Sequence, residues 1–205
     1  MSEATSVSSA PAVPAALAAL IARHSLGGKH LVEPGPDAAA LAWMAEAALH
    51  APDHAELAPF RFAVVQGSAR QALARLFTQA ALDAGKDADA AALDAERAAR
   101  APVTVAVLAR IDLGHPLVPA HEQWMAVGGA LANFLNAAHL LGYAGKMLSG
   151  AKVRHAVLQQ AFCQPGETLV GWVALGTAAR PVGSRAPKAD VGAVCAPWQA
   201  PVQAG

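Results

Sequence analysis

The chain has 205 residues, and its 15 basic and 15 acidic side chains give a formal net charge of zero. It is 55% hydrophobic and only 15% charged, against about 25% charged residues in an average soluble domain. This composition excludes disorder as the main state, and the lack of a basic excess argues against a nucleic-acid partner. About a quarter of the residues are alanine, the best helix former, so we expect a helix-rich, well-packed domain.

Cysteine usage and hydropathy favour a protein of a reducing, cytoplasmic environment. Two cysteines, Cys163 and Cys195, are too few and too far apart for a disulfide framework or a zinc site. The first residues lack the basic segment of a signal peptide. Residues 126–145 carry no Asp, Glu, Lys or Arg and reach the length of about 20 residues that crosses a bilayer. Because two asparagines and a histidine interrupt them, we expect a buried core helix and no membrane partner.

Prolines and small residues near both ends predict one domain at 15–180 with an arm on each side. The N-terminal arm, 1–14, is interpreted as flexible, and the C-terminal arm spans 181–205. Within that domain, apolar spacing and β-branched runs predict elements by their periodicity. In chain order they are a helix at 15–24, a helix at 37–49, a strand at 61–65, a helix capped by Ser68, a solvated helix or mobile excursion at 87–100, a strand at 103–109, a helix at 119–142, a strand at 143–147, a helix at 152–162 and a strand at 168–175. About four strands among five or six helices indicate a layered α+β domain.

Several catalytic and metal-binding motifs fail when their spacing is checked. Gly27-Gly28-Lys29 lacks the first glycine and the following hydroxyl of a phosphate-binding loop. His121-Glu122 begins like a zinc-protease motif, but a methionine occupies the position of the second histidine. His50 and His54 have the spacing of two metal ligands, but a proline between them breaks the helix face. No dinucleotide-binding glycine motif and no nucleophile elbow are present, so we expect no metal.

Short segments in a fixed order carry a resemblance to a known family. They are Arg23-His24-Ser25 followed by Lys29, Glu33-Pro34, Ala51-Pro52-Asp53-His54, Pro59-Phe60-Arg61-Phe62, Arg100-Ala101-Pro102, Val118-Pro119 with Glu122-Gln123, Leu141-Gly142-Tyr143, Ser149-Gly150 and Leu175-Gly176-Thr177. Over residues 20–177 the chain resembles the nitroreductase family of FMN-dependent oxidoreductases, above all its small branch with APDH and VPxxEQ segments. The resemblance implies a mostly antiparallel sheet of about four strands flanked by helices, with FMN at the interface of a homodimer.

The resemblance assigns Arg23, His24 and Ser25 to FMN and places Lys29 at the pyrimidine edge of the flavin. Two additional residues, Gly27-Gly28, separate Lys29 from Ser25 when compared with the family pattern. From the residues alone, the same cations could equally be a solvated helix end that favours the helix dipole. FMN could interact with these cations in two ways. Its phosphate binds Arg, hydroxyls and free N–H groups, and a cation beside the ring raises the reduction potential of the flavin.

Three further groups of residues receive roles from the resemblance. The resemblance implies that His54 and the residue four positions before it, His50, contact FMN, from their own or from the partner subunit. The family pattern has Arg where this chain has His50. Met147-Leu148-Ser149-Gly150 forms a loop against the ring with N–H groups toward N5, although the family has Trp and Arg where Met147 and Leu148 stand. Arg185 returns to the phosphate. From the residues alone these are a helix end, a helix-start loop and a solvated charge.

Glu122 and Gln123 are expected to orient the long helix or the dimer interface. No general acid or base stands out, so we expect no catalytic side chain, and the cofactor would perform the chemistry. The resemblance implies an oxidoreductase that uses NAD(P)H to reduce nitroaromatics, quinones or similar small acceptors by ping-pong hydride transfer through flavin N5. The alternatives are a non-catalytic flavin-binding or carrier protein and a cofactor-free helical interaction domain.

Overall fold

The computed structural model describes residues 12–181, 183 and 186–200. The predicted flavin contact Arg185 lies outside the described residues, as does most of the predicted arm at 1–14. The division into two arms and one domain therefore stays a prediction.

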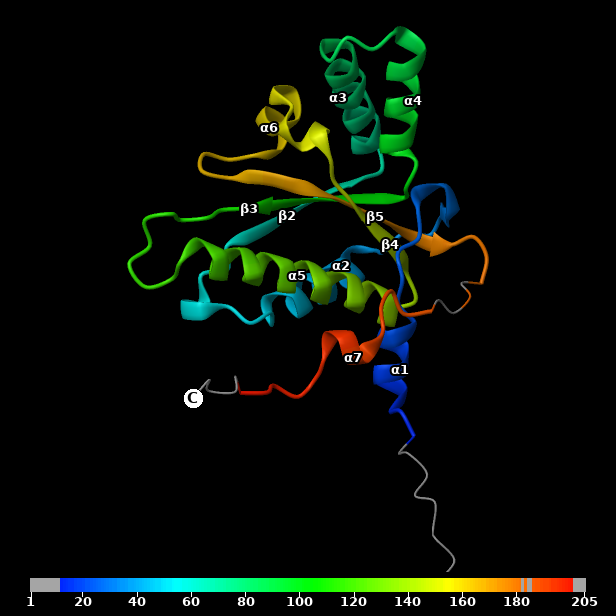
Figure 1. Ribbon diagram of the computed structural model, residues 1–205. Coiled ribbons are helices and arrows are strands. Elements are labelled where there is room, and N and C mark those ends of the chain that lie inside the picture. The colour runs from blue at the N-terminus through cyan, green and yellow to red at the C-terminus, as the bar shows by residue number, and fades with distance from the viewer. Residues whose placement is uncertain (1–11, 182, 184–185, 201–205) are drawn as a thin grey trace, which may run out of the picture.

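An antiparallel sheet forms the centre of the molecule (Figure 1). Its strands are β1 Leu31–Val32, β2 Phe60–Gln66, β3 Val103–Ala109, β4 Ala144–Leu148 and β5 Thr168–Ala178. All pairings between described strands are antiparallel, in the order β1-β5-β3-β2, with β4 also paired to β5. The predicted α+β class and mostly antiparallel sheet are confirmed. Within the described residues the sheet has five strands and not about four. The strand that was not predicted is β1, whose two residues are too few to show a period.

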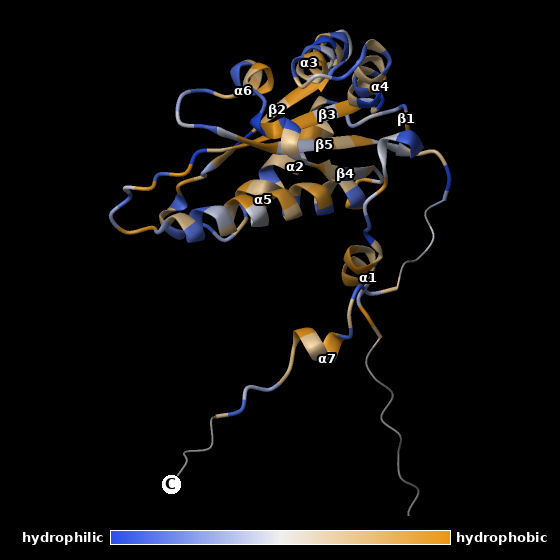
Figure 2. Cartoon of the chain, turned by 45° about the horizontal axis from the view of Figure 1, so that its top comes forward, coloured by the Kyte–Doolittle hydropathy of each residue, from blue (hydrophilic) through white to orange (hydrophobic). Residues whose placement is uncertain are grey.

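Helices cover both faces of this sheet, with α2 and α5 on one face and α3, α4 and α6 on the other (Figures 1 and 2). The helices are α1 Ala15–Ala22, α2 Ala38–Leu49, α3 Ala69–Asp83, α4 Ala88–Ala99, α5 Ala120–Leu140, α6 Ala156–Phe162 and α7 Val191–Val194. Single 3-10 turns span Gly28–His30, His54–Glu56 and Ala151–Arg154. The two larger hydrophobic clusters lie on opposite faces of the sheet, because every residue of β3 is buried and successive side chains point to opposite faces.

The core beneath α2 and α5 explains why the long apolar helix lies on the sheet. Phe134 of α5 is fully buried and stacks on Phe62 of β2, with 4.4 Å between the ring centroids. Met44 of α2 is buried in the same cluster. Residues 126–145 thus cover most of α5 and the first two residues of β4, and α5 packs on the core, as expected. Among the described residues, none of the helices combines the length and apolar character needed to cross a bilayer.

Local capping chemistry explains several helix boundaries and corrects others. Asp37 caps α2, since its carboxylate accepts a hydrogen bond from the N–H of Ala40 at 2.8 Å. Ser68 is the N-cap residue of α3, as predicted, but its side chain makes no capping hydrogen bond. The predicted helix at 152–162 is split at His155 into a 3-10 turn and α6. The charged segment at 87–100 is the helix α4, with one buried face against α3.

Candidate functional site

A cavity of about 630 Å³ opens beside the sheet, on the face covered by α3 and α4. Its walls come from the segment before β1, the middle of α3, the second half of α4, strands β3 and β5, and the stretch that runs from β4 into the next 3-10 turn. The volume lies within the roughly 300–1,000 Å³ typical of small-molecule sites.

The cavity joins two of the segments that the sequence assigned to one ligand. Lys29 lines it together with Leu148, Ser149 and Gly150, although about 120 residues separate them. A backbone hydrogen bond from the N–H of Leu26 to the carbonyl oxygen of Gly145, at 3.0 Å, ties the two segments together.

Glycines leave backbone groups open to the cavity. A Cβ atom added at Gly27, Gly28 or Gly150 would meet no atom within 4 Å. Gly150 also has a φ of +131°, which L side chains rarely adopt. The wall on both sides therefore presents exposed backbone that a planar ligand can approach.

Strand alternation separates Met147 from its predicted neighbours. Lys146 and Leu148 line the cavity, but Met147 is not among the described residues that do so. Its side chain packs against the core on the α2 and α5 face. The hydroxyl of Ser149 donates a hydrogen bond to the carbonyl oxygen of Val170 at 3.0 Å, which holds the loop after β4 against β5.

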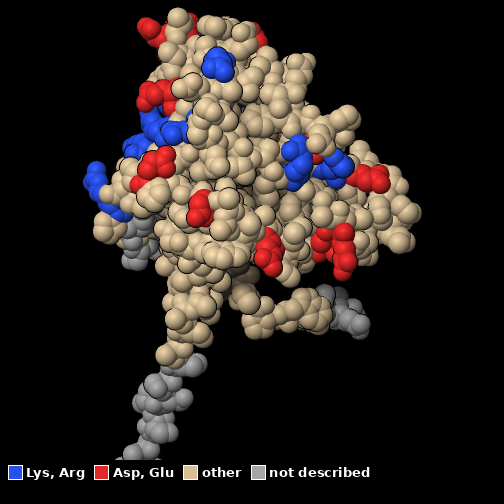
Figure 3. Space-filling model, turned by 180° about the vertical axis from the view of Figure 1, so that it is seen from behind, with Lys and Arg blue, Asp and Glu red and all other residues tan. Residues whose placement is uncertain are grey.

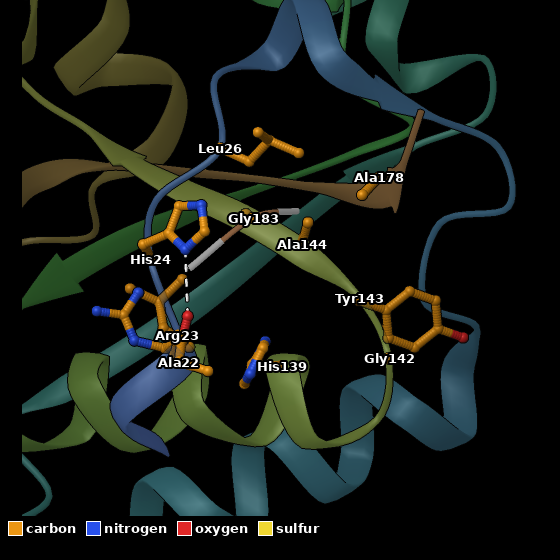
Figure 4. Close-up of a pocket in the computed structure, with 12 residues that line it drawn as sticks. Ala22, Arg23, His24, Leu26, His139, Gly142, Tyr143, Ala144, Ala178 and Gly183 are labelled. Atoms are coloured by element: carbon orange, nitrogen blue, oxygen red, sulfur yellow. Dashed lines mark hydrogen bonds between the residues drawn. The ribbon is translucent and has the colours of Figure 1, made fainter. Parts of the chain in front are cut away.

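Arg23 and His24 line a second, smaller cavity of about 270 Å³ (Figure 4). His139 of α5 and Tyr143 complete its walls, and Nδ1 of His24 lies 3.1 Å from the carbonyl oxygen of Ala22. Ser25 is exposed on the segment that runs from this cavity toward Lys29. The structure thus places Arg23 and His24 apart from the Lys29 cavity.

At two places in the chain, a residue that lines the smaller cavity is followed directly by a residue that lines the larger one. Leu26 and Gly145 line the smaller one, and the residues that follow each of them, Gly27 and Lys146, line the larger one.

His50 and His54 lie at the C-terminal end of α2. His50 is the C-cap residue of that helix and is exposed. Nδ1 of His54 lies 2.7 Å from Oε2 of Glu122, at the start of α5. Neither histidine is among the described residues that line the two cavities.

Gln123 anchors the start of α5, as the sequence predicted. It is buried, its Oε1 accepts the N–H of Asp112 at 2.8 Å, and its Nε2 donates to the carbonyl oxygens of Asp112 and Val118 at 2.8 and 2.9 Å. The amide thereby fixes the loop between β3 and α5.

The charged cluster in the wall of the large cavity was not predicted from the sequence. Asp94 of α4 is buried, and its Oδ2 lies 2.7 Å from Nζ of both Lys86 and Lys152. Burial alone would raise the pKa of Asp94, but the hydrogen bonds from the two ammonium groups lower it below its usual range. The one available signal was an acidic residue three positions after Ala91 on the buried face of α4.

Positive charge dominates the wall of the large cavity. Among the described lining residues, one is acidic, Asp94, and five are basic, namely Lys29, Arg97, Arg100, Lys146 and Lys152. Figure 3 shows basic side chains gathered mainly at two places, with acidic side chains near both, on a face whose other residues are mostly uncharged. Among the described residues, no group of three or more His, Cys, Asp or Glu side chains is placed to hold a metal ion.

Comparison with known proteins gives curated relatives and similar folds. The chain is 36% identical over 165 residues to "Putative NAD(P)H nitroreductase YdjA" of Escherichia coli (strain K12), a match that covers 79% of this chain and 87% of that protein. The chain is also 32% identical over 163 residues to "Putative NAD(P)H nitroreductase" of Haemophilus influenzae (strain ATCC 51907 / DSM 11121 / KW20 / Rd). That match covers 79% of this chain and 88% of that protein.

Solved structures share the fold at low sequence identity. A nitroreductase-like family protein from Bacillus cereus has a TM-score of 0.77 at 14% identity, over 94% of this chain and 100% of that chain. A Desulfovibrio desulfuricans protein solved in complex with FMN has a TM-score of 0.68 at 19% identity, over 93% of this chain and 100% of that chain. The family model described as "Nitroreductase family" matches residues 23–177, from Arg23 of the smaller cavity to the end of β5. With most of the chain covered by this match, the protein belongs to the Nitroreductase family.

Proposed function

We propose that this protein is an FMN-dependent oxidoreductase that uses NAD(P)H to reduce small electron-poor acceptors such as nitroaromatics and quinones. The observation that carries the proposal is the cavity in which Lys29 meets Leu148, Ser149 and Gly150, in a chain of the Nitroreductase family. The curated relatives named as NAD(P)H nitroreductases support it. The free thiols of Cys163 and Cys195 fit the reducing, cytoplasmic environment that we also propose.

The residues of the large cavity fit FMN in size and chemistry. The volume of about 630 Å³ suits a ring system, and the open backbone at Gly27, Gly28 and Gly150 allows a flat group to approach closely. Lys29 brings positive charge to a cofactor that becomes negatively charged when reduced. FMN, when bound, supplies the two-electron chemistry. The side chains and backbone of the protein therefore have to bind and orient the cofactor and polarise its ring.

Arg23, His24 and Ser25 remain our proposed contacts for the phosphate end of FMN. Arg23 and His24 lie in the smaller cavity, and the residues next to Leu26 and Gly145 pass directly into the larger one. A ligand with its ring beside Lys29 and its phosphate near Arg23 would follow this segment. Arg185, outside the described residues, stays a proposed phosphate contact.

We also propose that the protein is a homodimer with one cofactor site at each end of the interface. The outer sides of α2 and α5 expose large apolar side chains, among them Trp43 at 59%, Leu49 at 63% and Met125 at 70%. Such a surface favours burial against a second copy. His50 and His54 lie at the end of α2, away from the cavities of their own chain, and we propose that they act at the cofactor site of the partner subunit.

The visible spectrum of the purified protein, with and without added FMN, tests the cofactor proposal. We expect flavin absorption bands and oxidation of NADH or NADPH when a nitroaromatic or quinone acceptor is present. A protein that shows no flavin bands even after FMN addition would contradict the proposal and leave a cofactor-free interaction domain. A protein that binds FMN without turnover would instead be a flavin-binding or carrier protein.

Substitution of Arg23 tests the proposed phosphate contact. We expect Arg23→Ala to weaken FMN binding about 10- to 100-fold, because a hydrogen bond to a charged group contributes about 1.5–3 kcal/mol. The control is Arg75→Ala, on an exposed position of α3, which should leave FMN affinity unchanged. The measurement is quenching of flavin fluorescence on titration, and equal affinities for the two variants would contradict the assignment.

A further inference from the structure

The buried carboxylate of Asp94 holds a lysine ammonium in the wall of the large cavity. Lys152 lies 2.7 Å from Oδ2 of Asp94, and its Nζ also lies 5.1 Å above the ring of Phe77. All three residues line the cavity, next to the loop of Ser149-Gly150. Fixed at two points, the ammonium cannot turn away from the cavity without losing both contacts.

The second lysine on Asp94 has a different position. Lys86 lies at the same distance, 2.7 Å, from the same carboxylate oxygen, but it is not among the described residues that line the cavity. Of the two ammonium groups that Asp94 binds, that of Lys152 therefore belongs to a residue of the cavity wall.

Partial burial distinguishes the charge of Lys152 from the exposed cations of the cavity wall. The side chain of Lys152 is 34% exposed and that of Asp94 only 8%, whereas Lys29, Arg97 and Lys146 have exposed positions where water and salt screen them. Arg100, the remaining basic residue of the wall, is paired with Glu96 at 2.6 Å. A charge held close to a ligand in a partly dry wall interacts with it more strongly than a screened one.

We propose that Lys152 stabilises the negative charge of the reduced flavin ring and so raises its reduction potential, with Asp94 as the residue that positions the lysine. This rests on the proposed function. The ring system is the chosen target because Lys152 lies three residues after Ser149, at the start of the 3-10 turn, and lines the same cavity as Lys29. A phosphate contact would bind the oxidised and the reduced cofactor equally and would not change the potential.

The test compares the midpoint potential of FMN bound to the wild type, Lys152→Met, Lys152→Arg and Lys86→Met. We expect Lys152→Met to lose about tenfold in the preference for reduced over oxidised FMN, which for a two-electron couple is about 30 mV. Lys152→Arg keeps the charge and should stay within about threefold of the wild type. Lys86→Met removes an ammonium from the same carboxylate outside the cavity, and should also stay within threefold.

Each outcome decides the assignment. Equal shifts in Lys152→Met and Lys86→Met would show that the cluster acts only through structure, and an unchanged potential with weaker binding of both redox states would make Lys152 a phosphate contact. Either result overturns the proposal. If the methionine variant does not fold, as judged by circular dichroism, Lys152→Gln is measured in its place. A wild type that binds no FMN refutes the proposed function first, whereas bound FMN with four equal potentials refutes this inference alone.

Discussion

Glu167 shows how a single buried charge is held in this protein. Its side chain is only 2% exposed, yet it lies 2.6 Å from Arg61 and 3.2 Å from Arg110. The backbone N–H of Gln164 donates to the same carboxylate at 2.8 Å. The hydrogen bond from Arg61, which outweighs the effect of burial, lowers the pKa of Glu167 from 4.5 to about 2. The ion pair ties β2 to the turn before β5.

This pKa predicts how the stability depends on pH. Because the folded-state pKa is lower than the unfolded one, the ionised Glu167 stabilises the fold above pH 4.5, and this contribution is lost as the pH falls toward about 2. We expect Glu167→Gln to lower the free energy of unfolding by about 3 kcal/mol at pH 7. Urea unfolding of the wild type and of this variant at pH 7 and pH 3 measures the difference in the free energy of unfolding. The deficit relative to wild type should shrink at pH 3, and an equal deficit at both would contradict the ion-pair explanation.

For single residues, the sequence predicts what chemical role a side chain can have better than which side chains lie close together in the fold. The role of Gln123 was predictable because a polar residue at the start of an apolar helix needs buried partners. The cluster of Asp94, Lys86 and Lys152 was not, because Lys152 lies 58 positions from Asp94 in the sequence and the two meet only when α4 lies beside the 3-10 turn that follows β4. The separation of Arg23 from Lys29 was equally hidden, since it depends on the path of a glycine-containing segment.

The pairing of β4 with β5 positions the loop that follows β4. Leu148 pairs with Trp172 in the register, and a Cβ atom added at the neighbouring Gly171 would overlap the backbone oxygen of Leu148 and the side chain of Met147. Gly171 lies opposite Val107, where the register of β3 and β5 shifts. The close approach of the two strands thus requires glycine.

Gly171→Ala should therefore push the end of β4 away and disturb the cavity wall at Leu148. We expect a loss of about 1–3 kcal/mol in the free energy of unfolding, the usual cost of overpacking, together with weaker FMN binding. Chemical unfolding and a flavin titration measure the two effects. Gly114→Ala is the control, because its Cβ would make only an ordinary 3.5 Å contact with Asp112. If Gly171→Ala behaved like this control, the spacing argument would be wrong.

Elements with a strong period were predictable, and those fixed by tertiary contacts were not. The β-branched run of β3 and the apolar stripe of α5 appear close to their predicted bounds. The turn after α2 could not be predicted, because Ala55, Glu56 and Ala58 all have positive φ values that non-glycine residues rarely adopt. A hydrogen bond from the N–H of Ala58 to Oδ2 of Asp53, at 2.6 Å, helps to hold that backbone.

On the scale of the whole molecule, much apolar surface has no cover within one described chain. α1 buries none of its residues in the described part of the chain although it is apolar throughout, and Val191, Val194 and Trp198 near the other end are 70–83% exposed. In Figure 1, α1 and α7 both project from the body on the side of α5. These surfaces are the reason to expect a second copy.

Light scattering coupled to size-exclusion chromatography tests this expectation. We expect the wild type to elute as a dimer and Met125→Glu, on the exposed side of α5, as a monomer, because burying an unpaired carboxylate in an apolar interface is costly. Leu93→Glu is the matched control, since Leu93 is 40% exposed on α4, across the sheet from α5. A monomeric wild type, or two variants with the same mass, would contradict the proposed interface.

The fold class and family could be predicted because short motifs keep their order along the chain, whatever their distance in space. The partner surface could not be predicted with the same sharpness, because alanine-rich helices have similar composition on buried and exposed sides. Trp43 illustrates this difficulty, since a tryptophan within an apolar helix suggests the core, yet it is 59% exposed.

The pairing of β1 with β5 has a consequence for the order of folding. Leu31 lies opposite Ala178, and the N–H of Ala179 donates to the carbonyl oxygen of His30 at 2.9 Å, so Lys29 is fixed in place by residues almost 150 positions later. Contacts of such long sequence separation form late, because a large loop must first close. During synthesis from the N-terminus, the cavity is therefore incomplete until the last strand has left the ribosome, and a nascent chain should acquire its cofactor only at that final stage.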